Sequence, residues 1–278
     1  MRLSGFIGGI DMDAPIGVFD SGVGGLTVVR EIMRQLPSEN VIYFGDTARV
    51  PYGSKSKDTV LKFSKQIVRF LMTKNVKAIV FACNTASALA LEDMRHEIEI
   101  PVVGVVRPGA RMAADMSKTK SVGIIGTDAT IKSGIYNDYI RQLDPEITVV
   151  GKACPLFVPL VEEGLLEDRI TDDMVDRYLS ELKPYNVDAL VLGCTHYPLL
   201  MNPIKRYMGD SVTLVNPAYE TAKELKSILQ KNDMLNSATS TPNYEFYVSD
   251  GVDKFKAFAD DVLPINVKSV NVVDIESY

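Results

Sequence analysis

Short apolar runs rich in Val and Ile alternate with longer amphipathic stretches along the chain, and this alternation constrains the fold most strongly. The runs are PIGVF, NVIYF, KAIVFA, IPVVGVV, KSVGIIG, ITVVG, DALVLG and SVTLV. Each run is followed by a turn residue and then by a helical pattern such as LTVVREIMRQL. Buried runs of this length, separated by helices, are typical of parallel sheets that helices cover on both faces. The sequence therefore predicts an α/β fold.

The same sequence events recur in the second half of the chain, which indicates an internal repeat. PIGVFDSG matches SVGIIGTD, KAIVFACNT matches DALVLGCTH, and VVGVVRPGARMAADM matches SVTLVNPAYETAKEL. The anchor pairs lie 106, 111 and 109 positions apart: Ser21 with Thr127, Cys83 with Cys194, and Pro108 with Pro217. We therefore expect two similar, pseudo-symmetric domains, each a mostly parallel sheet flanked by helices, with the active site in the cleft between them.

The repeat also sets the expected domain boundaries. The first α/β domain spans residues 1–105 and is completed by 218–278, which contains a helix, the YEFYV strand and a further helix. The second domain spans 106–217. The first dozen residues are expected to be a disordered leader, unless translation starts at Met12. The polar stretch SATSTPN at 237–243 is expected to form an extended loop.

Composition excludes several classes of protein. A net charge of −6 and a pI near 5.1 give no sign of the clustered basic surface that binds nucleic acid. No run approaches the ~18 to 20 apolar residues of a membrane span, and the N-terminus does not resemble a signal peptide. Three cysteines without close spacing predict free thiols in a reducing compartment. We expect a cytoplasmic protein that acts on a small molecule.

Cys83 and Cys194 occupy matching positions at the carboxyl ends of predicted strands. Ligands of open α/β sheets bind beyond these strand ends, so two facing units would place the thiols on opposite walls of one cleft. A thiol has a pKa of about 8.5, which a helix N-terminus or a nearby cation can lower. One thiolate could then remove a proton from carbon while the other thiol protonates the opposite face. That chemistry inverts a stereocentre.

A structural role is the alternative for each cysteine, because free cysteine often fills a core as a small hydrophobe. Cys83 and Cys194 are each followed by polar residues, CNT and CTH, which favours a site. Cys154, in GKACPLFVP, has neither a repeat partner nor polar neighbours, and we predict that it is structural. His96 lies among charged residues and is expected to be a solvated helix position.

Several long motifs resemble the glutamate racemases of the aspartate/glutamate racemase superfamily. They are IGVFDSGVGGLTVVREI, YFGDTARVPYG, FACNTASA, VPLVEEG and LVLGCTHYPLL, and the resemblance runs from about residue 15 to about residue 258. It implies reversible, cofactor-independent interconversion of L- and D-glutamate, which supplies D-glutamate for peptidoglycan in the bacterial cytoplasm. It implies that Cys83 and Cys194 are the opposed acid and base, and that a homodimer is possible.

The resemblance also assigns supporting residues. Asp20 would assist proton transfer at Cys83, and His196 would assist it at Cys194. Glu162 in PLVEEG matches a third assisting carboxylate, with Glu163 as the alternative register. Substrate contacts would come from four pairs of neighbours: Asp20 and Ser21, Tyr52 and Gly53, Asn84 and Thr85, and Thr195 and His196.

The chemistry of these residues suits a substrate with two carboxylates and one ammonium group. Asn, Ser, Thr and backbone amides at strand-to-helix turns can hold carboxylates, and Asp20 could instead pair with the ammonium. His196 suits general acid and base work because the pKa of histidine lies near neutral pH, although a structural histidine is the alternative. Without a cofactor as electron sink, the protein itself would have to stabilise the developing charge.

Other kinds of site fit these residues less well. DSGVGGLT is neither a P-loop nor a dinucleotide fingerprint, and Cys83, Cys194 and His196 do not have a familiar zinc-ligand spacing. We expect no metal and no cofactor, although the sequence alone does not exclude a Schiff-base lysine. The stretch LVNPAYETA and Arg107 depart from the family pattern away from the cysteines. The alternative functions are aspartate racemase and a non-catalytic amino-acid binding protein.

Overall fold

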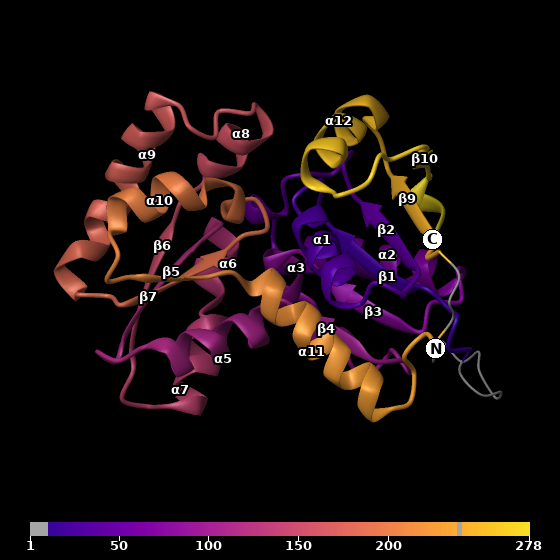
Figure 1. Cartoon of the computed structure of the whole chain (residues 1–278), viewed down its shortest axis with the longest axis horizontal. Coiled ribbons are helices and arrows are strands. Elements are labelled where there is room, and N and C mark those ends of the chain that lie inside the picture. Colours follow the sequence, from indigo (N-terminus) through magenta and orange to yellow (C-terminus); the bar gives the residue numbers. More distant parts are fainter. Residues whose placement is uncertain (1–10, 238–240) are drawn as a thin grey trace.

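The computed structural model describes residues 11–237 and 241–278. Most of the expected N-terminal leader and the middle of the expected SATSTPN loop therefore lie outside the described residues. The two halves of the molecule lie side by side, and each is built on its own sheet (Figure 1). In the part of the chain that the structure describes, no helix combines the length and the apolar character that a membrane span requires.

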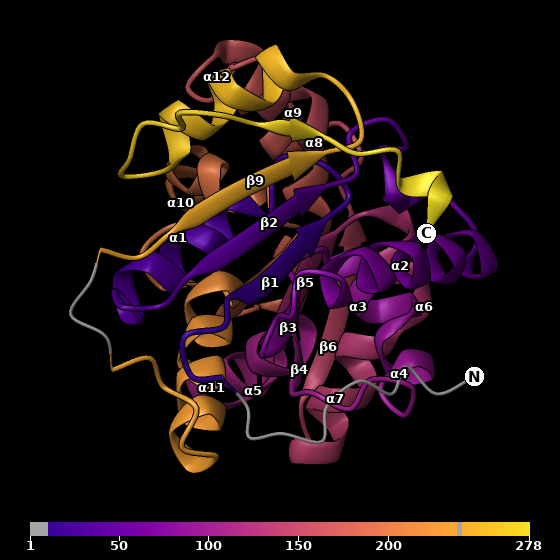
Figure 2. The ribbon, with the colours of Figure 1, turned by 90° about the vertical axis from the view of Figure 1, so that its right-hand side faces the viewer.

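Within the described residues, the strands form two parallel sheets. The first sheet has the order β10-β9-β2-β1-β3-β4 and the second has the order β6-β5-β7-β8. Figure 2 shows the strands β9, β2, β1, β3 and β4 of the first sheet following one another in that order. The first sheet contains β1 (Ile16–Asp20), β2 (Val41–Gly45), β3 (Ala78–Phe81), β4 (Val102–Gly104), β9 (Tyr244–Val248) and β10 (Asn271–Val272). The second contains β5 (Ser121–Gly126), β6 (Thr148–Ala153), β7 (Ala189–Gly193) and β8 (Thr213–Val215).

The repeat seen in the sequence is also present in the sheet topology. The order β2-β1-β3-β4 recurs as β6-β5-β7-β8, with every strand replaced by its counterpart in the second half. The prediction of an α/β fold with two similar units of mostly parallel sheet is confirmed. In both sheets the strand order reverses between the first and third strands of the unit, which is where ligands bind in folds of this kind.

The helices lie between the strands, as the amphipathic stretches predict. They are α1 (Leu26–Gln35), α2 (Lys57–Met72), α3 (Asn84–Leu89), α4 (Leu91–Met94), α5 (Val106–Met116), α6 (Asp128–Ser133), α7 (Ile135–Leu143), α8 (Phe157–Glu162), α9 (Arg169–Leu179), α10 (Met201–Met208), α11 (Pro217–Lys231) and α12 (Val252–Val262). Short 3₁₀ helices span Tyr52–Ser54, Ser180–Tyr185, Tyr197–Leu200 and Ile275–Ser277. The local sequence determines where these helices begin. Ser56 caps α2, and Asn216 caps α11 ahead of a proline at the first helical position.

The core lies on both faces of each sheet because side chains alternate along a strand. In the first sheet, Val18 and Val80 face the cluster that contains α1, α11 and α12, whereas Phe19 and Phe81 face the cluster that contains α2. The two phenylalanine rings meet edge to face with centroids 4.5 Å apart. Each such side chain contributes about 1.5–3 kcal/mol when fully buried. The strand ends that carry the site are therefore held by a rigid, packed scaffold.

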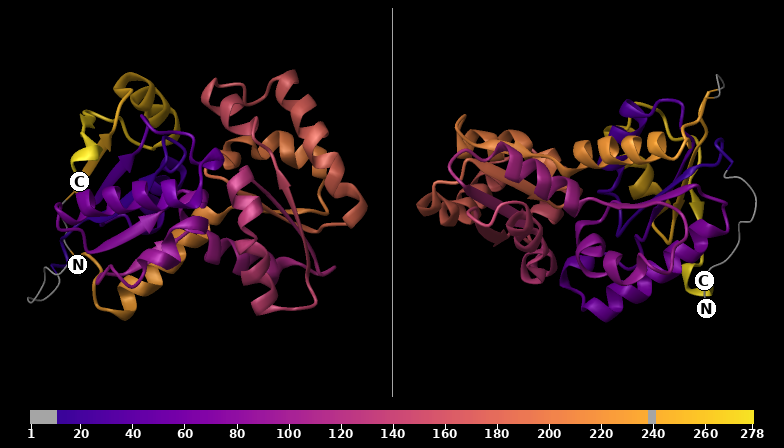
Figure 3. Two further views of the ribbon diagram at one scale, coloured as in Figure 1. Left: turned by 180° about the vertical axis from the view of Figure 1, so that it is seen from behind. Right: turned by 90° about the horizontal axis from the view of Figure 1, so that it is seen from below.

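In residues 11–237 and 241–278, the chain crosses between the halves at the start of α5 and at the start of α11 (Figure 3). Val105 is 1% exposed and Pro217 is buried, so neither crossing is an exposed linker. Helix α11 contacts both α1 in the first half and α5 in the second. After α11 the chain returns to the first sheet, where β9 pairs with β2. The domain boundaries near residues 105 and 217 stay a prediction, and β10 was not predicted because it is only two exposed residues long.

Candidate active site

The two repeat cysteines lie at equivalent strand ends. Cys83 follows β3 and caps α3, where its sulfur accepts a hydrogen bond from the Ala86 backbone N–H at 3.4 Å. Cys194 directly follows β7. Their side chains are almost fully buried, at 4% and 6% exposure. The position of each thiol is thus set by the strand-to-helix turn that the sequence repeats.

The turns after β1 and β7 come from different halves and touch each other. The Thr195 hydroxyl donates to Oδ1 of Asp20 at 3.4 Å, and the Thr27 hydroxyl donates to the Thr195 carbonyl at 3.1 Å. A Cβ atom on Gly24 would lie 2.4 Å from Oγ1 of Thr195 and 2.5 Å from Nδ1 of His196. Only glycine allows this approach. The strand ends of the two halves therefore face each other across one seam.

On the second half of the seam, three side chains form a row. Nδ1 of His196 lies 3.8 Å from the sulfur of Cys194, and Nε2 lies 3.2 Å from Oε1 of Glu162. Burial alone would lower the pKa of His196, but the contacts with Cys194 and Glu162 and the charge of Asp20 together raise it to about 10. The pKa of Glu162 is lowered by its hydrogen bond with His196 and, to a smaller extent, by its hydrogen bond with Lys254. At neutral pH the row therefore contains an imidazolium ion beside a sulfur.

The neighbouring Glu163 does not take part in this row. Its side chain is 72% exposed and lies 4.0 Å from the ammonium of Lys254. Glu162 is 18% exposed and is the carboxylate that reaches the histidine. Of the two registers left open by the sequence, the geometry favours Glu162.

On the first half of the seam, Cys83 lies near the carboxyl group of Asp20. Asp20 is fully buried, and Oδ2 accepts a hydrogen bond from the Gly22 backbone N–H at 3.1 Å. Burial raises the pKa of Asp20, against the opposing effects of the His196 charge and of backbone N–H groups. Burial and then the Asp20 charge raise the pKa of Cys83 to about 12, opposed by hydrogen bonds from Ala86 and Ser21. The Cys83 side chain is therefore a protonated thiol at neutral pH.

The remaining predicted contact residues lie along the same seam. Oδ1 of Asn84 accepts a hydrogen bond from the Tyr136 hydroxyl at 2.7 Å, so its amide N–H₂ is the group that can donate to a carboxylate. The hydroxyls of Thr85 and Thr127 lie 2.9 Å apart. A Cβ atom on Gly53 would lie 2.6 Å from Cβ of Thr127. Asn84, Thr85 and Gly53 thus all contact the second half.

Unlike Asn84, Thr85 and Gly53, Tyr52 is hydrogen-bonded through its side chain within the first half. Its side chain is 1% exposed, and its hydroxyl donates to Oδ2 of Asp46. Asp46 is itself held by Arg49 and Ser249. The phenol of Tyr52 therefore points into a buried polar network, which the sequence analysis missed although Asp46 stands in the FGDTARVPYG motif.

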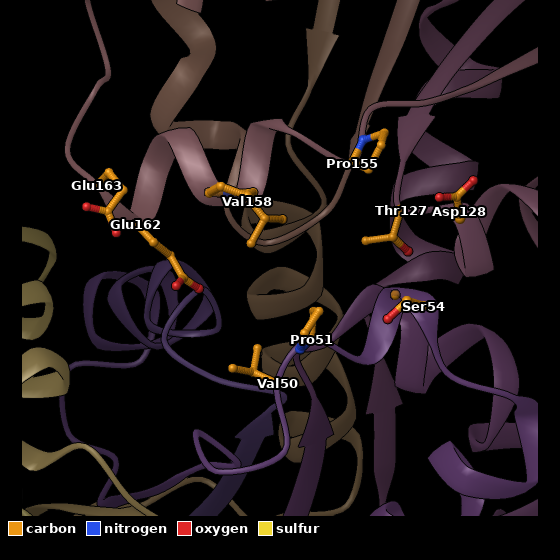
Figure 4. Close-up of a pocket in the computed structure, with 11 residues that line it drawn as sticks. Val50, Pro51, Ser54, Thr127, Asp128, Pro155, Val158, Glu162 and Glu163 are labelled. Atoms are coloured by element: carbon orange, nitrogen blue, oxygen red, sulfur yellow. The ribbon is translucent and has the colours of Figure 1, made fainter.

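A cavity of about 280 Å³ adjoins the seam. It is lined by Val50, Pro51, Gly53, Ser54, Thr127, Asp128, Pro155, Val158, Pro159, Glu162 and Glu163. Figure 4 shows Val50 and Pro51 on one side, Val158 and Pro155 on the other, and Glu162 reaching into the space between them. Gly53 and Glu162 belong both to the lining and to the predicted site, so the cavity borders the site, although neither Cys83 nor Cys194 lines it.

Cys154 and His96 are the two residues for which the sequence predicts no role in the site. Cys154 is fully buried in the core of the second half, and burial raises the pKa of its thiol. His96 is exposed in the turn after α4. Among the residues described, no three His, Cys, Asp or Glu side chains are grouped to hold a metal ion. Cys194 and Glu162 contact opposite nitrogens of the His196 ring, which does not suit one shared ion.

Known proteins resemble this chain over nearly its whole length. Residues 16–225 match the family model described as Asp/Glu/Hydantoin racemase. A glutamate racemase of Geobacter metallireducens is 51% identical over 235 residues, which cover 84% of this chain and 87% of that protein. The structure of a glutamate racemase isoform from Bacillus anthracis has a TM-score of 0.92 at 41% identity, covering 95% of this chain and 98% of that one. The glutamate racemase of Francisella tularensis in complex with D-glutamate has a TM-score of 0.91 at 40% identity, covering 96% and 100%.

The fold and these likenesses together define the class of the protein as an amino-acid racemase, an isomerase. More particularly, the chain belongs to the Asp/Glu/Hydantoin racemase family, and the relatives named above are glutamate racemases. The resemblance stated from the sequence motifs is confirmed.

Proposed function

We propose that this protein interconverts L- and D-glutamate reversibly by a two-thiol mechanism without a cofactor. The observation that carries the proposal is the pair of buried thiols at equivalent strand ends of two facing units. The similar relatives are glutamate racemases, and the solved relative that binds D-glutamate shares the fold over almost the entire chain. A binding protein would need no matched pair of proton donors and acceptors.

The resting protein offers different groups on the two faces of a bound substrate. Cys83 is a protonated thiol, whereas the sulfur of Cys194 lies beside the His196 cation. In one direction, the Cys194 thiolate removes the α-proton and the Cys83 thiol delivers its own proton to the opposite face. The α-carbon keeps its four substituents with inverted configuration, and the protonation states of the two sulfurs are exchanged. Proton exchange with solvent restores the starting state, and the reverse direction uses the same groups in opposite roles.

The surrounding residues would orient the substrate and stabilise the charge that develops on its α-carboxylate. Asn84 can donate through its amide, and Ser21, Thr85 and Thr195 supply hydroxyls along the seam. Asp20 would assist Cys83 or pair with the ammonium, and Glu162 would act through His196. Preorganised donors in a site closed to water are the main source of such stabilisation. Tyr52 would support the site through its backbone, since its hydroxyl is engaged with Asp46.

The wider role follows from the substrate. We propose that the product D-glutamate is used for peptidoglycan, and that the enzyme acts in the bacterial cytoplasm, where its free thiols stay reduced. The homodimer implied by the resemblance stays a prediction.

Circular dichroism of D-glutamate incubated with the purified protein, reducing agent and no added cofactor tests the proposal. The glutamate signal should decay to zero, while a parallel sample of aspartate should stay constant. The Cys83→Ala variant should lose racemisation by at least about a thousandfold while remaining folded, because the reaction loses one of its two proton carriers. Decay with aspartate alone would favour aspartate racemase. Two constant signals, or full activity in Cys83→Ala, would contradict the proposal.

A further inference from the structure

Helix α12 presents two side chains to the His196 row from outside the family motifs that define the site. The ammonium of Lys254 lies 3.2 Å from Oε2 of Glu162, and the ring centroid of Phe258 lies 6.3 Å from that of His196. Positions four apart share one face of a helix. One face of α12 therefore covers the contact between Glu162 and His196.

The contact between Lys254 and Glu162 joins the two halves of the molecule. Helix α12 follows β9 of the first sheet, and its Phe255 and Ala259 are buried in the core of the first half. Glu162 ends α8, which follows β6 of the second sheet. Phe258 packs against the cores of both halves. Lys254 thus approaches Glu162 from a helix anchored in the other half of the seam.

The two oxygens of Glu162 have separate partners. Oε1 lies 3.2 Å from Nε2 of His196, and Oε2 lies 3.2 Å from the Lys254 ammonium. His196 in turn lies 3.8 Å from the Cys194 sulfur. The row runs from an exposed ammonium (59% exposed) through a partly buried carboxylate (18%) to a buried imidazole (3%). With both oxygens held, the carboxylate has one orientation toward the histidine.

We propose that Lys254 is a positioning residue for racemisation, which holds Glu162 in the orientation that keeps His196 against Cys194. This inference rests on the proposed function, because it concerns the same site. An exposed ion pair contributes little to stability, so removing Lys254 should leave the protein folded and change the site alone.

The kinetic test compares Lys254→Met, which keeps an apolar stem but removes the charge, with Lys254→Arg and with Lys256→Met. Lys256 is exposed on the same helix two residues further on, and hence on another face. Lys254→Met should lower kcat about twofold to fivefold in both directions, with KM changed less than twofold, as expected from the size of an exposed ion pair. Lys254→Arg should restore kcat, and Lys256→Met should match the parent protein. Unchanged kcat in Lys254→Met, or an equal loss in Lys254→Arg, would overturn the proposal.

A second readout does not depend on turnover. The chain has two histidines, and the exposed His96 provides an internal reference for ¹⁵N–¹H spectra of the His196 ring. The charged or titratable groups that face His196 are Cys194, Glu162 and Asp20, with Lys254 behind Glu162.

If Lys254 positions Glu162, the His196 pKa of about 10 should fall in Lys254→Met, because the hydrogen bond to Glu162 that raises this pKa is weakened. A rise would show that Lys254 acts only through its charge, and an unchanged value would show no coupling; either overturns the proposal. Failure of the proposed function would appear separately, as a parent protein that does not racemise glutamate.

Discussion

The two thiols of the seam lie in opposite electrostatic surroundings. Cys83 lies beside the buried Asp20, and burial together with that anion raises its pKa to about 12. Cys194 lies beside His196, whose raised pKa of about 10 keeps the imidazole protonated at neutral pH. A thiolate is the reactive form of cysteine, and a nearby cation favours it. In the proposed mechanism, Cys83 of one repeat donates a proton and Cys194 of the other, beside the histidine, accepts one.

Alkylation by iodoacetamide, followed by peptide mass spectrometry, tests this asymmetry. At pH 7 Cys194 should react before Cys83, with the core residue Cys154 as an unreactive reference. The rate at Cys83 should rise as the pH increases from 7 toward 12, because a raised pKa delays formation of the thiolate to higher pH. Faster modification of Cys83 than of Cys194 at pH 7 would contradict the assignment.

At the scale of elements, the site depends on the contact between the turn after β1 and the turn after β7. Gly24→Ala would place a methyl group 2.4 Å from Oγ1 of Thr195 and 2.5 Å from Nδ1 of His196. The side chains of Thr195 and His196, or the turns that carry them, must shift, so we expect kcat to fall at least about a hundredfold. Gly17→Ala, at the start of β1 against a Val76 methyl 3.1 Å away, is the control and should affect stability more than activity. Equal kcat for Gly24→Ala and the parent protein would show that this contact is unimportant.

The sequence predicted the elements better than it predicted the contacts between them. All eight apolar runs and YEFYV form strands, because short runs rich in Val, Ile, Tyr and Phe favour extended structure. The repeat also predicted that the two cysteines occupy equivalent strand ends. It could not predict that Tyr136 orients Asn84, that Asp46 holds the Tyr52 hydroxyl, or that Lys254 reaches Glu162. Asn84 and Glu162 meet partners from another helix in the other half, which periodicity within one element does not encode.

At the scale of the whole molecule, the candidate site exists only where the two halves meet. Asp20 and Cys83 come from the first sheet, and Cys194 and His196 follow β7 of the second. The two crossings between the halves are buried at helix starts, and α11 packs against both halves. These features favour small rigid-body adjustments of the halves over the motion of free linkers. We predict that adjustments of this kind open the seam for substrate entry.

The central claim is that different groups remove and return the α-proton. L-glutamate incubated with the protein in D₂O and stopped early, with the enantiomers separated and analysed by mass spectrometry, tests this claim most directly. Two thiols predict that the D-glutamate formed carries deuterium at the α-carbon, while the recovered L-glutamate keeps its hydrogen, because the delivering thiol has exchanged with solvent before it acts. D-glutamate that retains the original α-hydrogen would mean that one group both removes and returns the proton, and would contradict the account.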